Sequence, residues 1–160
     1  MAVAPMTIGA GASCNGQGRA CQRPGKTMND HRPTQYERIA VAAVALAAKG
    51  IHPAAAWDAA AKDICASPST ADKRCPRSAF LGLAGAGAIV GVLPGDYCAA
   101  SKNARYAEQA LALLRADETL INQPRELWRR VLMGEERKYN QQMHVVTALW
   151  RTKKFVGQRA

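Results

Sequence analysis

The sequence has few aromatic residues, no long apolar run and no closely spaced pair of cysteines. Of its 160 residues, 48% are hydrophobic and only 6% are aromatic, so alanine supplies much of the apolar content and favours helices that approach closely. The absence of a run of about 18 apolar residues excludes a membrane-spanning helix. The amino terminus lacks a basic segment followed by an apolar core, and we expect no secretory signal.

The cysteines are odd in number and never occur as C-x-x-C. This pattern indicates neither a zinc site nor a disulfide framework. We therefore expect no metal, no cofactor and a reducing cytoplasm as the location. The five cysteines are Cys14, Cys21, Cys65, Cys75 and Cys98.

Acidic residues are also scarce, since 12 Asp and Glu stand against 22 Lys and Arg, for a net charge of +10. A chain of this length is sufficient for one domain with its own core. A basic balance attracts nucleic acid, anionic membrane surfaces or acidic proteins without choosing among them. Ordinary solubilising charge is the simpler alternative.

Apolar spacing and helix-capping residues predict an all-α domain. Thr34 and Glu37 have the spacing of a capping box, which opens a helix that ends near Gly50. Three prolines, each followed by apolar residues at helical spacing, suit the first turn of a helix, where the missing N–H costs nothing. We expect six helices, at about residues 34–49, 53–66, 76–85, 101–116, 124–133 and 135–152.

This helical domain, residues 34–152, lies between two segments of different composition. Residues 1–33 lack periodic apolar content and predict a flexible amino-terminal arm, and residues 153–160 form a basic tail. An apolar run bounded by glycine and proline leaves room for one very short β-hairpin near residues 88–98. We expect five large apolar side chains to share one core: Trp57, Phe80, Leu83, Trp128 and Trp150.

The stretch from Lys73 to Tyr97 is the most constrained in residue type and contains the strongest candidate site. Pro76 predicts a helix start that places Cys75 at or near the N-cap. A helix start offers free N–H groups and partial positive charge, which suit a phosphate or carboxylate. The predicted anion-binding residues are Lys73, Arg74, Arg77 and Ser78.

The same helix start would favour a reactive thiolate at Cys75, which suggests an enzyme as the alternative. His144 is the candidate base of such a nucleophilic pair, with Asn103 or Asn140 to orient it. A phosphatase-type loop is excluded, because Leu81 stands where its arginine is needed. Polar and aromatic residues near the fourth helix predict either capping or a pocket wall: Tyr97, Ser101, Asn103, Tyr106 and Asn140.

Three motifs occur together in this chain: Lys73-x-Cys75-Pro76-x-x-x-Phe80-Leu81-Gly82-Leu83, then Tyr97 with Asn103 and Tyr106-Ala107, then Asn140-Gln141-x-Met143-x-Val145-Val146-x-Ala148-Leu149-Trp150. Over about residues 34–156 they resemble a family of small bacterial helical proteins of unknown function. The resemblance implies a single fold and a cytoplasmic bacterial origin, and it implies no catalytic roles.

The sequence thus favours a helical module that binds an anionic partner, either nucleic acid or an acidic protein, and that does not associate with membranes. A small enzyme that uses Cys75 or the adjoining polar pocket is one alternative. A defence- or toxin-associated protein that works through protein contacts is another.

Overall fold

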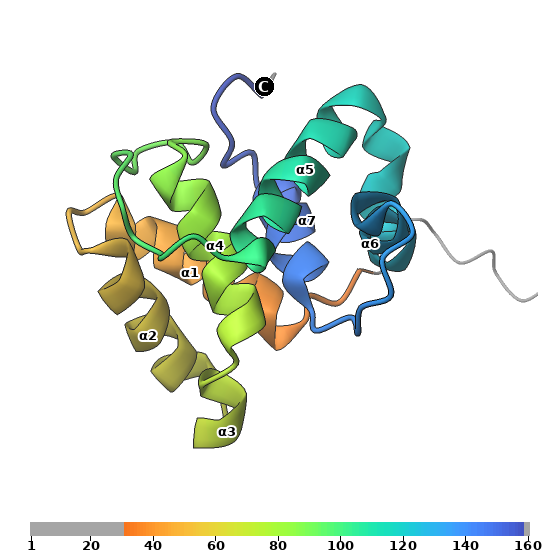
Figure 1. Cartoon of the computed structure of the whole chain (residues 1–160). Coiled ribbons are helices and arrows are strands. Elements are labelled where there is room, and N and C mark those ends of the chain that lie inside the picture. Colours follow the sequence, from red (N-terminus) through yellow and green to blue (C-terminus); the bar gives the residue numbers. More distant parts are fainter. Residues whose placement is uncertain (1–30, 159–160) are drawn as a thin grey trace, which may run out of the picture. The chain divides into compact units, whose positions relative to one another are not determined.

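The computed structural model describes residues 31–158, and the expected arm at residues 1–33 lies almost wholly outside this range. The described residues form seven α-helices and one 3-10 helix, η1 (Figure 1). Six of the α-helices are the six expected ones, and a four-residue helix, α3, follows α2. The bounds are α1 Gln35–Ala47, α2 Pro53–Ile64, α3 Pro68–Ala71, α4 Arg74–Gly85, α5 Lys102–Ala116, η1 Glu118–Asn122, α6 Pro124–Leu132 and α7 Gln142–Arg151.

Local sequence signals set most of the helix starts. Thr34 caps α1 with both bonds of a capping box, in which Glu37 accepts from the Thr34 N–H at 2.7 Å. Proline is the first residue of α2 and of α6. The Ser101 hydroxyl accepts from the Ala104 N–H and caps α5. These predicted starts are confirmed.

Helix α7 is the central element of the domain. It contacts α1, α4, α5 and α6, while α1 pairs with α2 and α4 pairs with α5 (Figure 1). Every residue from Val145 to Trp150 is buried. A helix that is buried on all sides must be apolar on all sides, which explains its run of valine, alanine, leucine and tryptophan.

The five residues predicted to share one core do so. Trp57, Phe80, Leu83, Trp128 and Trp150 are all buried in a single apolar cluster. The rings of Trp57 and Phe80 pack with their centroids 5.2 Å apart and join α2 to α4. No helix in the described part of the chain is long and apolar enough to cross a membrane.

Gly82 lets α4 and α5 approach closely. A Cβ atom placed at Gly82 would lie 2.6 Å from the Ala104 Cα, and backbone cannot move aside as a flexible side chain does. We predict that Gly82→Ala lowers the free energy of unfolding by about 1–3 kcal/mol through overpacking. Urea denaturation tests this, with Gly50→Ala at a site of open space but positive φ as a comparison. Unchanged stability of Gly82→Ala would contradict close α4–α5 packing.

The hairpin considered for residues 88–98 does not form. Ile89 instead makes an isolated antiparallel bridge with Phe155, and this is the only bridge outside helices in residues 31–158. Phe155 is buried in the core cluster, and the Gln158 side-chain amide donates to the Trp150 carbonyl. The basic carboxy-terminal segment is therefore packed on the domain as far as residue 158.

The last helix is shorter than predicted. We expected it over residues 135–152, but it begins at Gln142, after a non-helical segment at residues 135–141. Gln141, which precedes the helix, adopts the left-handed conformation at φ 69°, and the Gln142 side-chain oxygen accepts from the Asn140 N–H. This local side chain–backbone bond competes with helical pairing and explains the late start.

Candidate anion-binding site

Pro76 predicted a helix that begins at residue 76, but α4 begins two residues earlier, at Arg74. Lys73 is the N-cap residue, and Cys75 is already the second residue of the helix. Cys75 is therefore near the N-cap, as predicted, but it does not cap the helix itself, because the chain becomes helical at Arg74, before the proline. No side chain caps α4. Its first backbone N–H groups therefore have no side-chain acceptor, which is a requirement for an anion site.

The predicted cations at this helix start have different roles. Arg77 forms a bidentate pair with Asp58 of α2, at 2.7 and 2.9 Å, and this bond raises the pKa of the guanidinium. Lys73 places its ammonium 5.7 Å from the centre of the Tyr36 ring. Arg74 is exposed and makes no salt bridge within residues 31–158. Lys73 and Arg74 thus remain available to a ligand, while Arg77 binds α2 and Ser78 is half-buried.

A chain of side-chain hydrogen bonds joins the starts of three helices. The Asn140 amide donates to the Cys75 sulfur at 3.7 Å, and the Asn140 N–H donates to Gln142. The Gln142 amide then donates to the Asn103 side-chain oxygen at 3.1 Å. Since these residues lie in the first turns of α4, α7 and α5 or just before them, the positive ends of three helix dipoles meet here.

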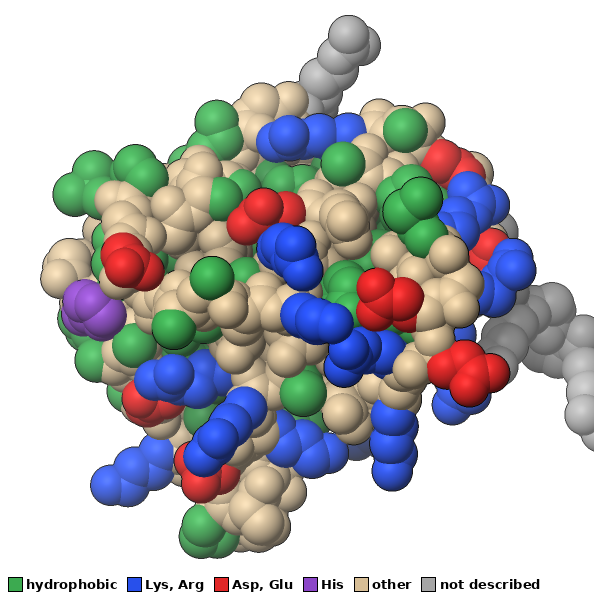
Figure 2. All heavy atoms as spheres, in the orientation of Figure 1, with side chains coloured by type: hydrophobic (Ala, Val, Ile, Leu, Met, Phe, Trp, Pro, Cys, Tyr) green, Lys and Arg blue, Asp and Glu red, His purple; other side chains and the backbone are tan. Residues whose placement is uncertain are grey.

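Exposed cations surround this meeting point. Lys102 and Arg105 lie in the first turns of α5, and Lys138 lies in the segment before α7; none makes a salt bridge within the described residues. We call Arg74, Lys102, Arg105 and Lys138 the cationic face. Figure 2 shows Lys and Arg side chains gathered across the lower part of this side of the domain.

The electrostatics of Glu135 confirm that the start of α5 lies beside residues 135–141. Glu135 accepts from the Tyr106 hydroxyl at 3.0 Å and from Arg137 at 3.4 Å. These two hydrogen bonds lower the pKa of its carboxyl, and the charge of Lys102 adds to the effect. Lys102 and the segment that contains Lys138 therefore lie near each other, although 36 positions separate the two lysines in the sequence.

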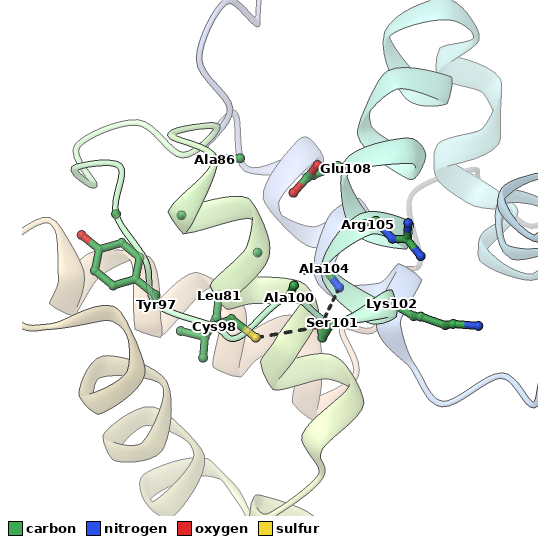
Figure 3. Close-up of a pocket in the computed structure, with 13 residues that line it drawn as sticks. Leu81, Ala86, Tyr97, Cys98, Ala100, Ser101, Lys102, Ala104, Arg105 and Glu108 are labelled. Atoms are coloured by element: carbon green, nitrogen blue, oxygen red, sulfur yellow. Dashed lines mark hydrogen bonds between the residues drawn. The ribbon is translucent and has the colours of Figure 1, made fainter.

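A cavity of about 600 Å³ lies beside the cationic face, between α4, the loop at residues 95–101 and the start of α5 (Figure 3). Lys102 and Arg105 line it together with Glu108. Tyr97 and Ser101 also line it, with the Cys98 thiol 3.8 Å from the Ser101 hydroxyl. Its remaining wall is built from small or apolar residues: Leu81, Gly82, Gly85, Ala86, Gly95, Ala100 and Ala104.

The five residues predicted to form one polar pocket are divided among three places. Tyr97 and Ser101 line this cavity, whereas Asn103 and Asn140 belong to the hydrogen-bond chain. Tyr106 is buried with its ring edge-on to Trp128, at 5.2 Å between centroids. Burial and its bond to Glu135 raise the pKa of the Tyr106 hydroxyl.

The structure does not bring Cys75 and His144 together as a nucleophilic pair. Cys75 contacts Asn140, whereas the His144 Nδ1 lies 3.8 Å from Glu37. Only the orienting residue expected for Cys75 is therefore in place. His144, the base that a catalytic Cys75 would need, lies against Glu37 instead.

The sequence did not reveal the roles of two buried side chains, Glu37 and Gln142. Glu37 was assigned only to the capping box, but its carboxylate also accepts from Arg151 at 2.9 Å. Gln142 is the buried centre of the hydrogen-bond chain. The position of Gln142 beside Asn140 and Gln141 in the sequence was the only indication of this role. Helical spacing placed Gln142 within a helix, whereas it is the first residue of α7.

The fold and the site define a small all-helical domain with a cationic, cysteine-containing junction of helix starts. Residues 33–156 match the model of a family of unknown function, DUF6979, and the chain belongs to this family. This agrees with the resemblance seen in the sequence motifs. No match was found among curated proteins, and none among proteins of solved structure.

Proposed function

We propose that this protein is a non-enzymatic module that binds an anionic partner in the bacterial cytoplasm. One observation carries the proposal: the starts of α4, α5 and α7 meet beside four exposed cations that make no salt bridge in the described part of the chain, although Glu135 and Glu108 lie near Lys102. Helix starts and unpaired cations both favour negative charge. Arg77, by contrast, forms a salt bridge with Asp58.

Nucleic acid is the partner that this surface fits best. The cations come from three separate elements, so they are spaced to meet several phosphates rather than one carboxylate. The large aromatic rings near the site, Tyr106 and Trp128, are buried and cannot stack on bases. Contacts of this kind reach the phosphate backbone and position the partner without reading its sequence.

Replacing two of these cations is expected to weaken binding. For Lys102→Ala combined with Arg105→Ala, we expect a loss of about tenfold or more in affinity for duplex DNA or RNA at moderate salt, because two phosphate contacts disappear. Fluorescence anisotropy with labelled duplexes of unrelated sequence measures this. Both residues are exposed, so the fold should be unaffected.

The matched control is Lys49→Ala combined with Lys62→Ala, which removes the same charge at two exposed positions, just after α1 and in the last turn of α2. Equal losses for the two double variants would show that net charge alone drives binding. Preference for an acidic peptide over nucleic acid would instead support the acidic-protein partner. A defined protein complex with no anion dependence would support an interaction factor of the defence-associated type.

A further inference from the structure

A second cavity, of about 650 Å³, lies between the starts of α6 and α7 and shares no lining residue with the cationic face. Every residue that lines it except Pro124 carries a polar group, although much of the lining surface is apolar. Two arginines, a histidine and a tyrosine are among the residues that face it. The full lining is Asn122, Gln123, Pro124, Arg125, Glu126, Arg129, Tyr139, Gln141 and His144.

His144 is held with one side of its ring against a buried carboxylate. Its Nδ1 atom is buried without a hydrogen bond and lies 3.8 Å from the Oε1 atom of Glu37. Glu37 is only 2% exposed and is fixed by the Thr34 N–H and by Arg151. The His144 side chain keeps 16% of its surface exposed, and this part of the ring lines the cavity.

The two arginines of the cavity differ in availability. Arg129 forms a bidentate pair with Glu126 at 2.8 Å for both bonds, so its charge is largely neutralised. Arg125 is exposed and has no salt bridge within residues 31–158. Arg125 is therefore the free cation of this cavity among the described residues.

Tyr139 lies between these groups. Its ring centre is 5.9 Å from that of His144, and its hydroxyl is buried without a hydrogen-bond partner in the described chain. Burial strongly raises the pKa of this hydroxyl, the charge of Glu37 raises it further, and that of Arg125 lowers it. A buried hydroxyl that stays protonated and has no acceptor is a free donor.

The helix starts beside this cavity also favour a bound anion. Gln123 and Gln141 precede α6 and α7, both line the cavity, and neither caps its helix with its side chain. Neither helix start has a side-chain cap, so free backbone N–H groups remain in both first turns, although Pro124 itself has none.

We propose that this cavity binds a small oxyanion, a carboxylate or a phosphate, between Arg125 and the protonated ring of His144. The Glu37 carboxylate behind the ring supports its positive charge, and Tyr139 supplies a further donor after a small movement of its side chain. The charged and titratable groups around His144 are Glu37 from α1 and Tyr139, with Arg125, Glu126 and Arg129 of α6 lining the same cavity and Arg151 of α7 bound to Glu37. An anion bound beside the ring favours the charged imidazole, so anion binding and ring protonation are linked.

Sulfate is the probe for the pH dependence, because its charge does not change between about pH 5.5 and about pH 8, where imidazoles titrate. Titration calorimetry with the full chain should show sulfate binding that weakens by about tenfold or more across this range. Inorganic phosphate and succinate, each compared with sulfate at the lower pH, then distinguish a phosphate from a carboxylate ligand.

His144→Gln should weaken sulfate binding by about tenfold or more at the lower pH and remove its pH dependence, since a charged donor is lost. Arg125→Ala, at an exposed position that does not affect folding, should weaken it to a similar degree. Arg115→Ala, which removes an exposed arginine elsewhere, should leave it unchanged. Binding that is equal in all three variants, that does not depend on pH, or that is absent from the unmodified chain would overturn the proposal.

Discussion

Phe80→Ala is expected to lower the free energy of unfolding by about 3–5 kcal/mol. Phe80 is fully buried, and its ring packs on Trp57, so α2 and α4 lose an aromatic contact when it is removed, although the Arg77–Asp58 pair still joins them. The central helix α7 also packs on α4, so the surrounding core cannot collapse easily into the space left behind. Urea denaturation followed by tryptophan fluorescence and by circular dichroism measures the change.

A matched truncation at the surface is the control for this variant. Leu93 is 80% exposed, and Leu93→Ala should change the free energy of unfolding by less than about 0.5 kcal/mol. A loss below about 1 kcal/mol for Phe80→Ala would show that α4 does not pack on α2 as described.

Arg151→Met is expected to cost about 3 kcal/mol, because it leaves the buried Glu37 carboxylate without the nearest cation that the described structure shows. Methionine keeps much of the length and the packing of the arginine stem, but the variant also loses the bonds of Arg151 to the Ile121 carbonyl and the Asn122 side chain, so the single loss includes more than the charge. The Arg151 side chain is 23% exposed and the Thr34 N–H still binds Glu37, which places the expected cost at the lower end for a broken buried pair.

A double-mutant cycle separates the ion pair from other effects of the substitution. Glu37→Gln removes the buried charge and should itself destabilise the protein, but Arg151→Met added to it should cost clearly less than in the unmodified chain. Strictly additive losses would contradict an energetic coupling between α1 and α7 at this pair.

Local sequence patterns predicted the helices well where the determining contacts are close in the chain. The capping box of α1, the prolines of α2 and α6 and the hydroxyl of Ser101 each act within three residues, and each helix starts where it was expected. Helical spacing predicted many of the apolar core positions within the helices, but Ile89 and Phe155 are core residues outside them, and Phe155 lies in the segment predicted to be a basic tail. The same reasoning failed for residues 135–141, where a glutamine bonds the backbone two positions away and no periodicity reveals it.

The composition of the candidate site was predicted only in part, because the contacts that decide it are distant in sequence. Arg77 was predicted to bind an anion, but Asp58, 19 positions earlier, already binds it. The bond from Asn140 to Cys75 spans 65 positions, and that from Arg151 to Glu37 spans 114. Residue type and spacing identify such side chains as candidates, and only the packing of helices selects their partners.

The dependence of nucleic-acid binding on salt tests the cationic face most directly. With Arg74, Lys102, Arg105 and Lys138 each on a phosphate, the logarithm of the affinity for duplex DNA should fall with the logarithm of salt concentration at a slope of about −3 to −4. Lys102→Ala combined with Arg105→Ala should reduce the magnitude of that slope by about 2 and weaken binding equally for unrelated sequences. Affinity that is independent of salt, or a slope that this double variant leaves unchanged, would contradict nucleic-acid binding at the cationic face.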